Sequence, residues 1–337
     1  MEDGNKGPYK YVFICGLNRS GTTLLGRNIG RLENCTDFKD IPKMQVKEGW
    51  KLQDVYPLEF ELGGPGRYGF NSRAHLTESS SLLSPENVAR LRKAWHLFWD
   101  KNKTICVEKT PANLLMTRFL QAAFPNSYFI VIRRHPVAVS MSTQRMWKVS
   151  ITSLHRLFDH WLHCYELFEQ DKKHLRHVYE LTYEDYVEDP ARYHREIAQF
   201  VGTQVPEKGL EQPSAAQSKK YLDRWCKLLK DSRCKHYYRY IARKYEPRFS
   251  KHGYSLTNGL VPPEEALRWE REPSAVLAIL YCLWADMCAF LSRFAKAKSG
   301  PKLLIEAILP RFILVRIWRI RLKQIVNQAK RLQLSDA

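Results

Sequence analysis

The stretch from Tyr11 to Leu25, YVFICGLNRSGTTLL, constrains the fold of this chain more than any other feature. It begins with a short apolar run that is typical of a buried strand. A polar loop bounded by Gly16 and Gly21 follows, and two threonines then open a helix. A strand, a glycine-bounded loop and a helix N-terminus form an anion site, because the loop N–H groups point inward and the helix dipole adds partial positive charge. The stretch therefore predicts an α/β fold that binds a phosphate-like group.

The residues of this loop differ from those of a nucleotide-hydrolysing P-loop. Such a loop reads G-x4-G-K-[ST], in which the lysine binds the β- and γ-phosphates and the Ser or Thr binds magnesium. Here Thr22 stands in the place of the lysine, and the cation lies inside the loop at Arg19. The loop keeps a phosphate cradle but lacks the residue that grips a triphosphate. It therefore predicts a donor other than ATP or GTP, used without a metal.

The charge of the chain indicates an anionic partner. Its 337 residues include 54 Lys+Arg against 35 Asp+Glu, a net charge of +19. This excess suits a nucleotide, a sulfated or phosphorylated acceptor, nucleic acid or an acidic membrane face. The eight cysteines form no C-x-x-C pair and are not a disulfide framework, which favours a reducing compartment. Because no signal or 18-residue apolar run is evident, we expect a cytoplasmic protein, or a Golgi lumenal one whose anchor was removed.

Apolar runs that alternate with helical patterns predict the fold class. We expect a three-layer α/β/α fold with a central parallel sheet, resembling P-loop nucleotide-binding proteins, and a C-terminal helical extension. The domain boundaries follow as 1–256 and 257–337. Ligands of such sheets bind beyond the carboxyl ends of the strands. The polar features at these strand ends are the Arg19 loop, Lys109, Arg133 with Arg134, and the segment 183–185. Two cationic clusters at one edge suit a ligand that is phosphorylated at both ends.

Several motifs resemble those of sulfotransferases that use 3′-phosphoadenosine 5′-phosphosulfate (PAPS). The segment 16–23 resembles their 5′-phosphosulfate loop, and Arg134, followed by Pro136 and Ser142, resembles their 3′-phosphate motif. Further segments that recur in the family are 108–111 (EKTP), 183–190 (YEDYVEDP) and 252–256 (HGYSL). The likeness covers residues 9–256. The chain lacks the loop lysine and the late Arg-Lys-Gly signature of the cytosolic steroid and phenol branch, which favours the carbohydrate or tyrosylprotein type.

The resemblance implies a role for each matching residue. Arg19 and the backbone amides of Ser20, Gly21, Thr22 and Thr23 would hold the 5′-phosphosulfate. Arg134 and Ser142 would hold the 3′-phosphate, with Thr143 as the substitute if the register shifts by one residue. Arg133 has the alternative reading of a solvated cation at the sheet edge. The donor would be PAPS and the product 3′,5′-adenosine bisphosphate (PAP), with no metal.

The acceptor hydroxyl also needs a general base. Glu48, followed by Gly49, resembles a Glu-Gly of one branch of the family and is our candidate. Its rivals in the same part of the chain are Asp37, Asp40, Asp54 and His75. Lys109 resembles a lysine that stabilises the leaving phosphate. The alternative readings are a solvated loop carboxylate for Glu48 and a cation that neutralises Glu108 for Lys109.

The C-terminal part lies outside the resemblance. Residues 296–337 carry ten Lys/Arg against Glu306 and Asp336, and apolar residues fall near one helical face. A basic amphipathic helix over 303–326 would contact a membrane surface or a partner, or pack on the catalytic domain. The apolar segment 276–291 is interrupted by Asp286, and we expect a docked core helix there. Within the resembling part, aromatic and basic residues interleave over 237–248, a pattern that could bind single-stranded nucleic acid. The resemblance implies instead that this helix covers the adenine and 3′-phosphate of PAPS.

The sequence thus favours a sulfotransferase that moves the sulfuryl group of PAPS to a hydroxyl of a glycan, a protein tyrosine or a metabolite. One alternative is a P-loop kinase acting on a small molecule, which Thr22 in place of lysine disfavours. The other is a non-catalytic scaffold that binds a membrane or a partner through its basic tail. The presence of Arg19, Arg134, Ser142 and a candidate base argues against such a degenerate scaffold.

Overall fold

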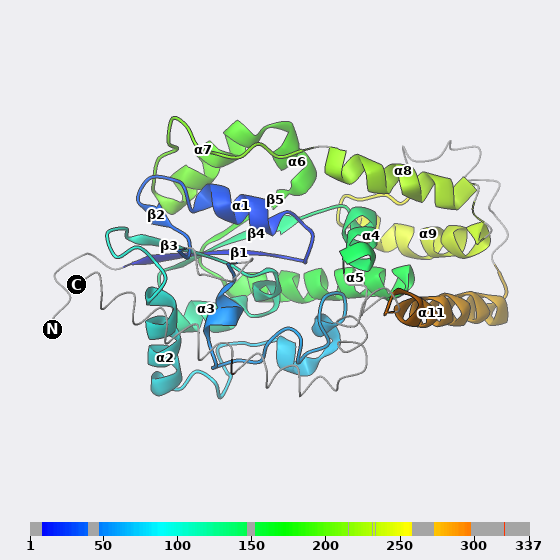
Figure 1. Cartoon of the computed structure of the whole chain (residues 1–337), viewed down its shortest axis with the longest axis horizontal. Helices are drawn as coiled ribbons and strands as arrows, with labels where there is room; N and C mark the ends of the chain where they lie inside the picture. Colours follow the sequence, from blue (N-terminus) through cyan, green and yellow to red (C-terminus); the bar gives the residue numbers. More distant parts are fainter. Residues whose placement is uncertain are drawn as a thin grey trace.

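A parallel β-sheet forms the centre of the molecule. The computed structural model describes residues 9–39, 47–146, 152–214, 216–230, 232, 234–257, 273–297 and 320. The sheet has the strand order β2-β3-β1-β4-β5, and all its pairings are parallel (Figure 1). Its strands are β1 (Lys10–Gly16), β2 (Cys35–Thr36), β3 (Ile105–Lys109), β4 (Ser127–Arg133) and β5 (Val178–Thr182). The predicted parallel sheet is confirmed. The two-residue strand β2 was not predicted, because no apolar run marks it in the sequence.

Helices cover both faces of this sheet, because its strands are apolar on both sides. Val12 and Ile14 of β1 pack with residues of α1 (Thr22–Ile29), α6 (Tyr183–Glu188) and α7 (Pro190–Val201). Phe13 and Cys15 point to the opposite face, toward α2 (Pro85–His96), α3 (Thr117–Ala123) and α5 (Leu154–Asp171). Figure 1 shows these helix groups on either side of the strands. The predicted three-layer α/β/α architecture is confirmed.

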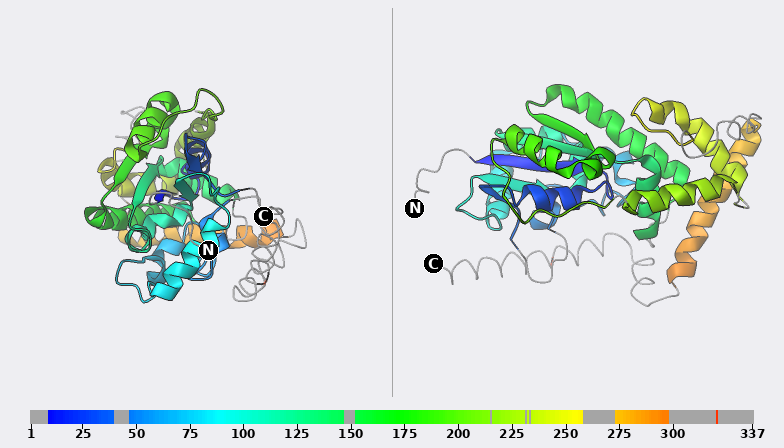
Figure 2. Two further views of the ribbon diagram at one scale, coloured as in Figure 1. Left: turned by 90° about the vertical axis from the view of Figure 1, so that its left-hand side faces the viewer. Right: turned by 90° about the horizontal axis from the view of Figure 1, so that it is seen from above.

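A second group of helices lies beyond the carboxyl ends of the strands. It comprises α4 (Pro136–Met146), α8 (Ala216–Lys230) and α9 (Lys235–Ser250), and α8 contacts both α4 and α9 (Figures 1 and 2). The segment after α9 returns toward the sheet: the Ser255 carbonyl lies 3.0 Å from His135 Nε2, and the Leu256 carbonyl accepts from Trp225 Nε1 at 2.9 Å. This group therefore encloses the sheet edge where ligands of such folds bind.

Short 3₁₀ helices shape the remaining wall of this edge. They are η1 (Gly49–Leu52), η2 (Tyr68–Phe70), η3 (Ser72–Ala74) and η4 (Pro111–Leu115), while η6 (Lys172–His174) leads into β5. Trp95 of α2 fixes the start of η1, because its Nε1 donates to the Gly49 carbonyl at 2.9 Å. The long connection between β2 and α2 is thereby held against the carboxyl end of β3.

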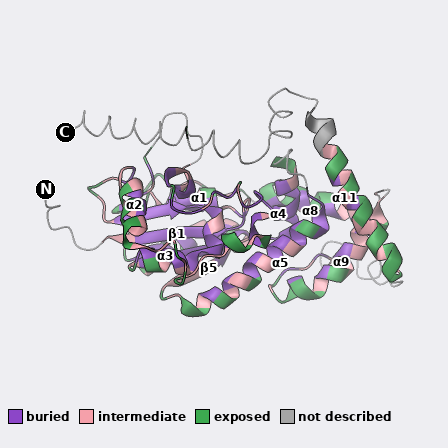
Figure 3. Cartoon of the chain, turned by 90° about the horizontal axis from the view of Figure 1, so that it is seen from below, coloured by how far each residue is buried: buried purple, intermediate pink, exposed green. Residues whose placement is uncertain are grey.

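The last described helix, α11 (Ala275–Ala297), departs from the expected docked core helix. Within 275–292, where burial is described, Ala285 and Ala289 are the buried hydrophobic residues, Tyr281 is partly buried, and most of the large apolar side chains are exposed (Figure 3). Asp286 does not interrupt an apolar core face; it turns toward the protein and pairs with Arg156 at 2.6 Å. By length and composition, Ala275–Ser292 could cross a membrane. Apart from Ile320, the tail predicted over 303–326 lies outside the described residues.

Candidate functional site

The loop between β1 and α1 adopts the backbone conformation of an anion cradle. Arg19 and Gly21 have φ values of 77° and 101°, in the left-handed region. A Cβ atom at Gly21 would lie 2.5 Å from the Tyr183 ring, so this position also lacks space for a side chain. Helix α1 begins at Thr22 without a side-chain cap. Its first N–H groups therefore remain available to an anion at the positive end of the helix dipole.

The two arginines that the sequence assigned to separate phosphates lie next to each other. Arg19 Nε donates to Ser142 Oγ at 2.9 Å. Arg134 Nη1 donates to the carbonyl of Arg19 at 2.9 Å, and its Nε donates to Ser218 Oγ of α8 at 3.0 Å. The Arg134 guanidinium also lies over the ring of Tyr183, 4.2 Å from its centroid. Hydrogen bonds from Arg19 and Arg134 to uncharged oxygen atoms thus link the phosphate loop with α4 and with the start of α8.

Arg134 has donor capacity that its protein contacts leave unused. The residue is only 5% exposed, and within the described part of the chain its Nη2 has no hydrogen-bond partner. Burial lowers the pKa of this guanidinium from its usual value. A buried donor of this kind is costly unless an acceptor completes it. Together with the open N-terminus of α1, it fits a ligand that brings more than one phosphate or sulfate group.

Thr143 and Arg133, for which the sequence left alternative readings, lie in other environments. Thr143 lines a small cavity of about 10 Å³ with Asn18 and His160, whereas Ser142 meets Arg19. Arg133 contacts the carboxylates of Glu169 and Glu180. Arg133 is therefore neither a solvated cation nor a free one; it is held in an ion-pair cluster on the sheet.

On the other side of the loop, Glu48 and Lys109 form an ion pair. Lys109 Nζ lies 2.6 Å from Glu48 Oε1, and Trp50 Nε1 donates to Glu48 Oε2 at 2.7 Å. The side chains of Lys109 and Glu48 are 8% and 13% exposed. Glu108 points elsewhere, accepting from the Gly49 N–H at 2.7 Å, so the partner of Lys109 is Glu48. Glu48 is thus an ordered, largely buried carboxylate rather than a solvated one.

The rival bases have partners away from this pair. Asp54 pairs with Arg90 at 3.0 Å and is 61% exposed, and Asp37 lies 3.7 Å from Lys47. The remaining candidates are also set apart: His75 contacts Asp171 at 2.8 Å, and Asp40 lies outside the described residues. Among the described candidates, Glu48 is the carboxylate that contacts Lys109.

A second buried carboxylate, Glu59, was not predicted from the sequence. It is 6% exposed, and its Oε2 accepts from Asn18 Nδ2 of the phosphate loop at 3.5 Å. No described group bonds its Oε1. Burial, and then the charge of Glu48, raise the pKa of Glu59 to about 8. Glu59 stands in the run PLEFELGG and belongs to no motif, so only its apolar neighbours hinted at burial.

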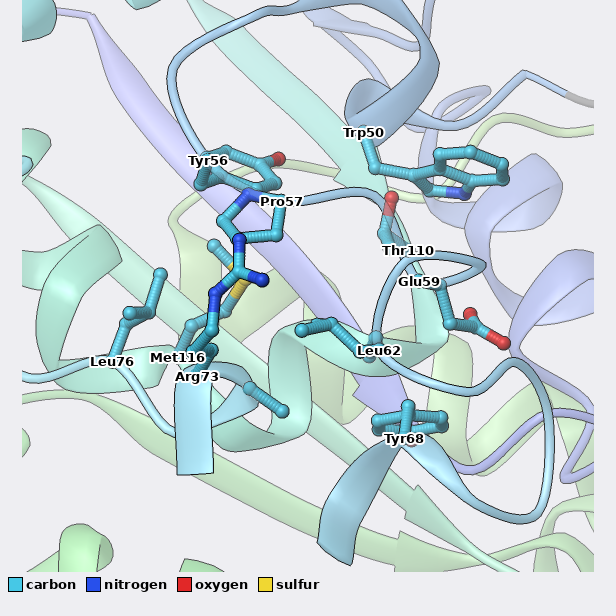
Figure 4. A pocket seen from close by; sticks show the side chains of 12 residues that line it. Trp50, Tyr56, Pro57, Glu59, Leu62, Tyr68, Arg73, Leu76, Thr110 and Met116 are labelled. Carbon is cyan, nitrogen blue, oxygen red and sulfur yellow. The ribbon is translucent and has the colours of Figure 1, made fainter. Parts of the chain in front are cut away.

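A small cavity of about 20 Å³ adjoins Glu59 (Figure 4). Its lining is mostly aromatic and aliphatic, with Thr110, Arg73 and Glu59 as polar members. The aromatic lining residues are Trp50, Tyr56 and Tyr68. Glu59 connects this cavity with the phosphate loop through Asn18, so the two features are neighbouring parts of one region.

No group of three or more His, Cys, Asp or Glu side chains that could hold a metal occurs in the described ranges. The ligand chemistry visible there consists of guanidinium, hydroxyl and backbone N–H donors at one end, and carboxylates with one lysine at the other. Such an arrangement can bind a doubly anionic nucleotide at the first end and handle a proton at the second.

Comparison with known protein families identifies the family of this chain. The family described as "Sulfotransferase family" matches residues 11–207, more than half of the chain. No curated protein matches the chain by sequence.

Solved structures of sulfotransferases also resemble the chain. The sulfotransferase domain of the Synechococcus PCC 7002 olefin synthase is 17% identical, covering 86% of this chain and 98% of that chain with a TM-score of 0.39. A sulfotransferase from Alicyclobacillus acidocaldarius is 19% identical, covering 65% of this chain and 91% of its own, with a TM-score of 0.38. At such scores neither bears on the substrate of this chain.

Proposed function

Because this chain belongs to the sulfotransferase family, we propose that it transfers a sulfuryl group from PAPS to a hydroxyl acceptor, without a metal, and releases PAP. The observation that carries this proposal is the linked set of Arg19, Ser142 and Arg134 at the mouth of an uncapped helix. Two adjacent cations with neutral partners suit a nucleotide that bears anionic groups at both its 3′ and 5′ positions.

In this proposal the chain holds the donor through three kinds of group. Arg19 and the N–H groups of Ser20, Gly21, Thr22 and Thr23 bind the 5′-phosphosulfate at the positive end of α1. Arg134 and Ser142 bind the 3′-phosphate. When bound, PAPS supplies an activated sulfuryl group whose bond to the 5′-phosphate oxygen is exchanged for a bond to the acceptor oxygen. Fixed positive charge stabilises the negative charge that develops on the leaving phosphate.

Glu48 is the proposed general base. A carboxylate has about four lone-pair positions, so Glu48 can accept a proton from the acceptor hydroxyl while Trp50 still binds its other oxygen. Lys109 holds Glu48 in place at 2.6 Å. The Cβ and Cγ of Lys109 pack against Gly26 of α1, the helix that follows the phosphate loop. We propose that Lys109 stabilises the bridging oxygen as charge accumulates there.

The acceptor is proposed to be a glycan, a protein tyrosine or a metabolite. The aromatic side chains beside Glu59, Trp50, Tyr56 and Tyr68, could pack against an acceptor whose hydroxyl is carried by an aromatic ring. At about 20 Å³ the cavity that they line holds no more than a water molecule or so, and an acceptor ring must displace lining side chains to enter.

Competition between nucleotides tests the donor. We expect PAP to bind in the absence of a divalent cation and to displace a fluorescent adenine nucleotide more strongly than ATP with magnesium does. Transfer of ³⁵S from labelled PAPS to a panel of phenols, tyrosine peptides and glycans then tests the reaction. Stronger competition by ATP with magnesium would support a small-molecule kinase instead, and PAP binding without transfer to any acceptor would support a non-catalytic scaffold.

A further inference from the structure

Helix α11 exposes a continuous apolar surface. Every exposed residue from Ala275 to Leu291 is apolar. The large side chains of this surface are 39–68% exposed: Val276, Leu277, Ile279, Leu280, Leu283, Trp284, Met287, Phe290 and Leu291. At 100° per residue they occupy one side of the helix, which we name the α11 apolar face. A surface helix of a water-soluble domain normally carries charged or polar residues on its outer side.

The opposite side of α11 is attached to the protein by polar contacts. Asp286 accepts from Ser153 Oγ at 2.6 Å and from both Nε and Nη2 of Arg156 at 2.6–2.9 Å. Ala285 and Ala289 are buried on the same side, and the helix contacts α9. Asp286 and these alanines hold α11 against the domain, and most of the α11 apolar face is turned away from it. Trp284, at the edge of the face, lies 6.4 Å from the ring of Tyr237.

Two exposed arginines lie near one edge of this face. A cavity of about 380 Å³ between α4, α8, α9 and α11 is lined by Arg145 and Arg224, which are exposed, and by Trp284 of the apolar face. The chain as a whole has a net charge of +19, and its residues 296–337 contribute ten Lys/Arg against two acids. An apolar helix face bordered by cations and a tryptophan is the chemistry that binds the surface of an anionic bilayer.

We propose that the α11 apolar face docks the protein onto an anionic lipid bilayer, with the helix lying in the plane of the membrane surface. The apolar side chains enter the region between headgroups and acyl chains. The arginines of the neighbouring cavity face the headgroups. Figure 2 shows α11 at the end of α8 and α9 that lies away from the sheet, so these two helices would separate the membrane surface from the carboxyl edge of the sheet.

The contacts of Asp286 distinguish this arrangement from a membrane-spanning helix. The segment 275–292 is long and apolar enough to cross a bilayer. In a spanning helix, however, Asp286 would lie in the hydrocarbon and would have to leave Arg156 and Ser153 or draw the start of α5 in with it. Both alternatives are costly, because an ionised side chain within a bilayer needs a partner. Lying at the interface keeps the ion pair and buries only apolar groups.

Flotation of the full chain with lipid vesicles tests the proposal. The vesicles contain phosphatidylcholine alone or phosphatidylcholine with phosphatidylserine at a ratio of about 3:1. We expect the protein to float with the anionic vesicles, and the double variant Leu283→Glu/Met287→Glu to bind at least about tenfold less. The matched control is Phe70→Glu, because Phe70 and Met287 are both 53% exposed. The control should float like the wild type. Arg224→Gln should reduce the preference for anionic vesicles.

Several results would overturn the proposal. One is equal flotation of the wild type and the double variant; another is an equal loss in the Phe70 control. Light scattering measures whether the protein is a dimer. If the wild type is a dimer, the double variant is a monomer and neither binds vesicles, a second copy of the chain covers the face. Retention of the bound protein after an alkaline carbonate wash would indicate a spanning helix and would contradict the interfacial orientation. Thermal unfolding confirms that each variant is folded.

Discussion

The two ends of the candidate site handle charge in opposite ways. Around the phosphate loop, Arg19 and Arg134 contact a hydroxyl, a carbonyl and an aromatic ring, and no carboxylate in the described ranges lies within ion-pair distance of either. Around the end of β3, buried carboxylates predominate: Glu48 is paired with Lys109, and Glu59 is held by Asn18. The first end has surplus positive charge that a ligand must complete. The second is nearly neutral before any ligand binds.

Two consecutive residues show the same difference at close range. Glu180 and Glu169 raise the pKa of Arg133 above its usual value, although burial opposes them. Burial lowers the pKa of Arg134, although the charges of Tyr183 and Glu184 oppose it, and no carboxylate of the described ranges forms an ion pair with this guanidinium. We therefore infer that Arg133 stabilises the sheet edge, whereas Arg134 remains able to bind an external anion. The pKa values of these two adjacent arginines shift in opposite directions because different groups surround them.

The largest effect is expected at the carboxylate end. Glu48→Gln keeps the size of the side chain but removes the proton acceptor and one of the two oxygens that accept from Lys109 and Trp50. We expect kcat for sulfate transfer to fall about 10²–10⁴-fold. PAP affinity should change little, since Glu48 is not among the phosphate ligands. The measurement is a steady-state assay with labelled PAPS beside calorimetric titration of PAP. Near-normal turnover would remove Glu48 from the mechanism.

At the phosphate end, Arg19→Ala removes one fixed cation. We expect a loss of about 10²–10³-fold in kcat/KM for PAPS, the range seen when a group that stabilises developing charge is removed. In contrast to the Glu48 variant, this one should also weaken PAP binding. Parallel titrations of the two variants check the contrast, and equal PAP affinities would remove the proposed division between the two ends.

The raised pKa of Glu59 predicts a pH-dependent stability. Its folded pKa of about 8 exceeds the usual value of 4.5, so the folded protein holds this proton to higher pH than the unfolded chain does. Stability should therefore fall as the pH rises from about 4.5 to about 8. Glu59→Gln should remove about 2–3 kcal/mol of that decline between pH 5 and 7.5. Urea unfolding at several pH values measures it; parallel curves for variant and wild type would be contrary to this account.

The smallest effect is expected from Ser142→Ala. The hydroxyl accepts from Arg19 at 2.9 Å, and its loss removes one hydrogen bond while both cations remain. We expect PAP affinity to fall about 5–10-fold, equivalent to about 1–1.4 kcal/mol. The matched variant Thr143→Ala should leave affinity unchanged. If Thr143→Ala weakens PAP binding more than Ser142→Ala does, the residue that binds the 3′-phosphate is Thr143 and not Ser142.

Local patterns predicted most of the fold, because its central strands are apolar on both faces. The runs 11–15 and 128–132 are such strands, and the glycines of the first loop mark where the chain must turn tightly. The two-residue β2 has no pattern of its own and exists only through its pairing with β3. The sequence therefore predicted the architecture but not every strand.

The residues that the sequence missed are those whose properties depend on distant neighbours. Glu59 reads as an ordinary loop acid until η2 and the phosphate loop enclose it. Asp286 reads as an interruption of an apolar helix, since its partner Arg156 lies 130 residues earlier. In both cases the sequence gives the residue type, but the orientation and the partners of the side chain depend on tertiary contacts.

The central claim is that Arg134, unlike Arg133, is reserved for a phosphate group of the nucleotide. Calorimetric titration of PAP without divalent cations into the wild type, Arg134→Ala and Arg133→Gln tests it most directly. We predict that Arg134→Ala weakens PAP binding about 30–100-fold, the loss of a charge-assisted hydrogen bond to a buried anion, and that Arg133→Gln changes it less than threefold, about 0.6 kcal/mol. Equal affinities for the wild type and Arg134→Ala, or equal losses in both variants, would contradict the account.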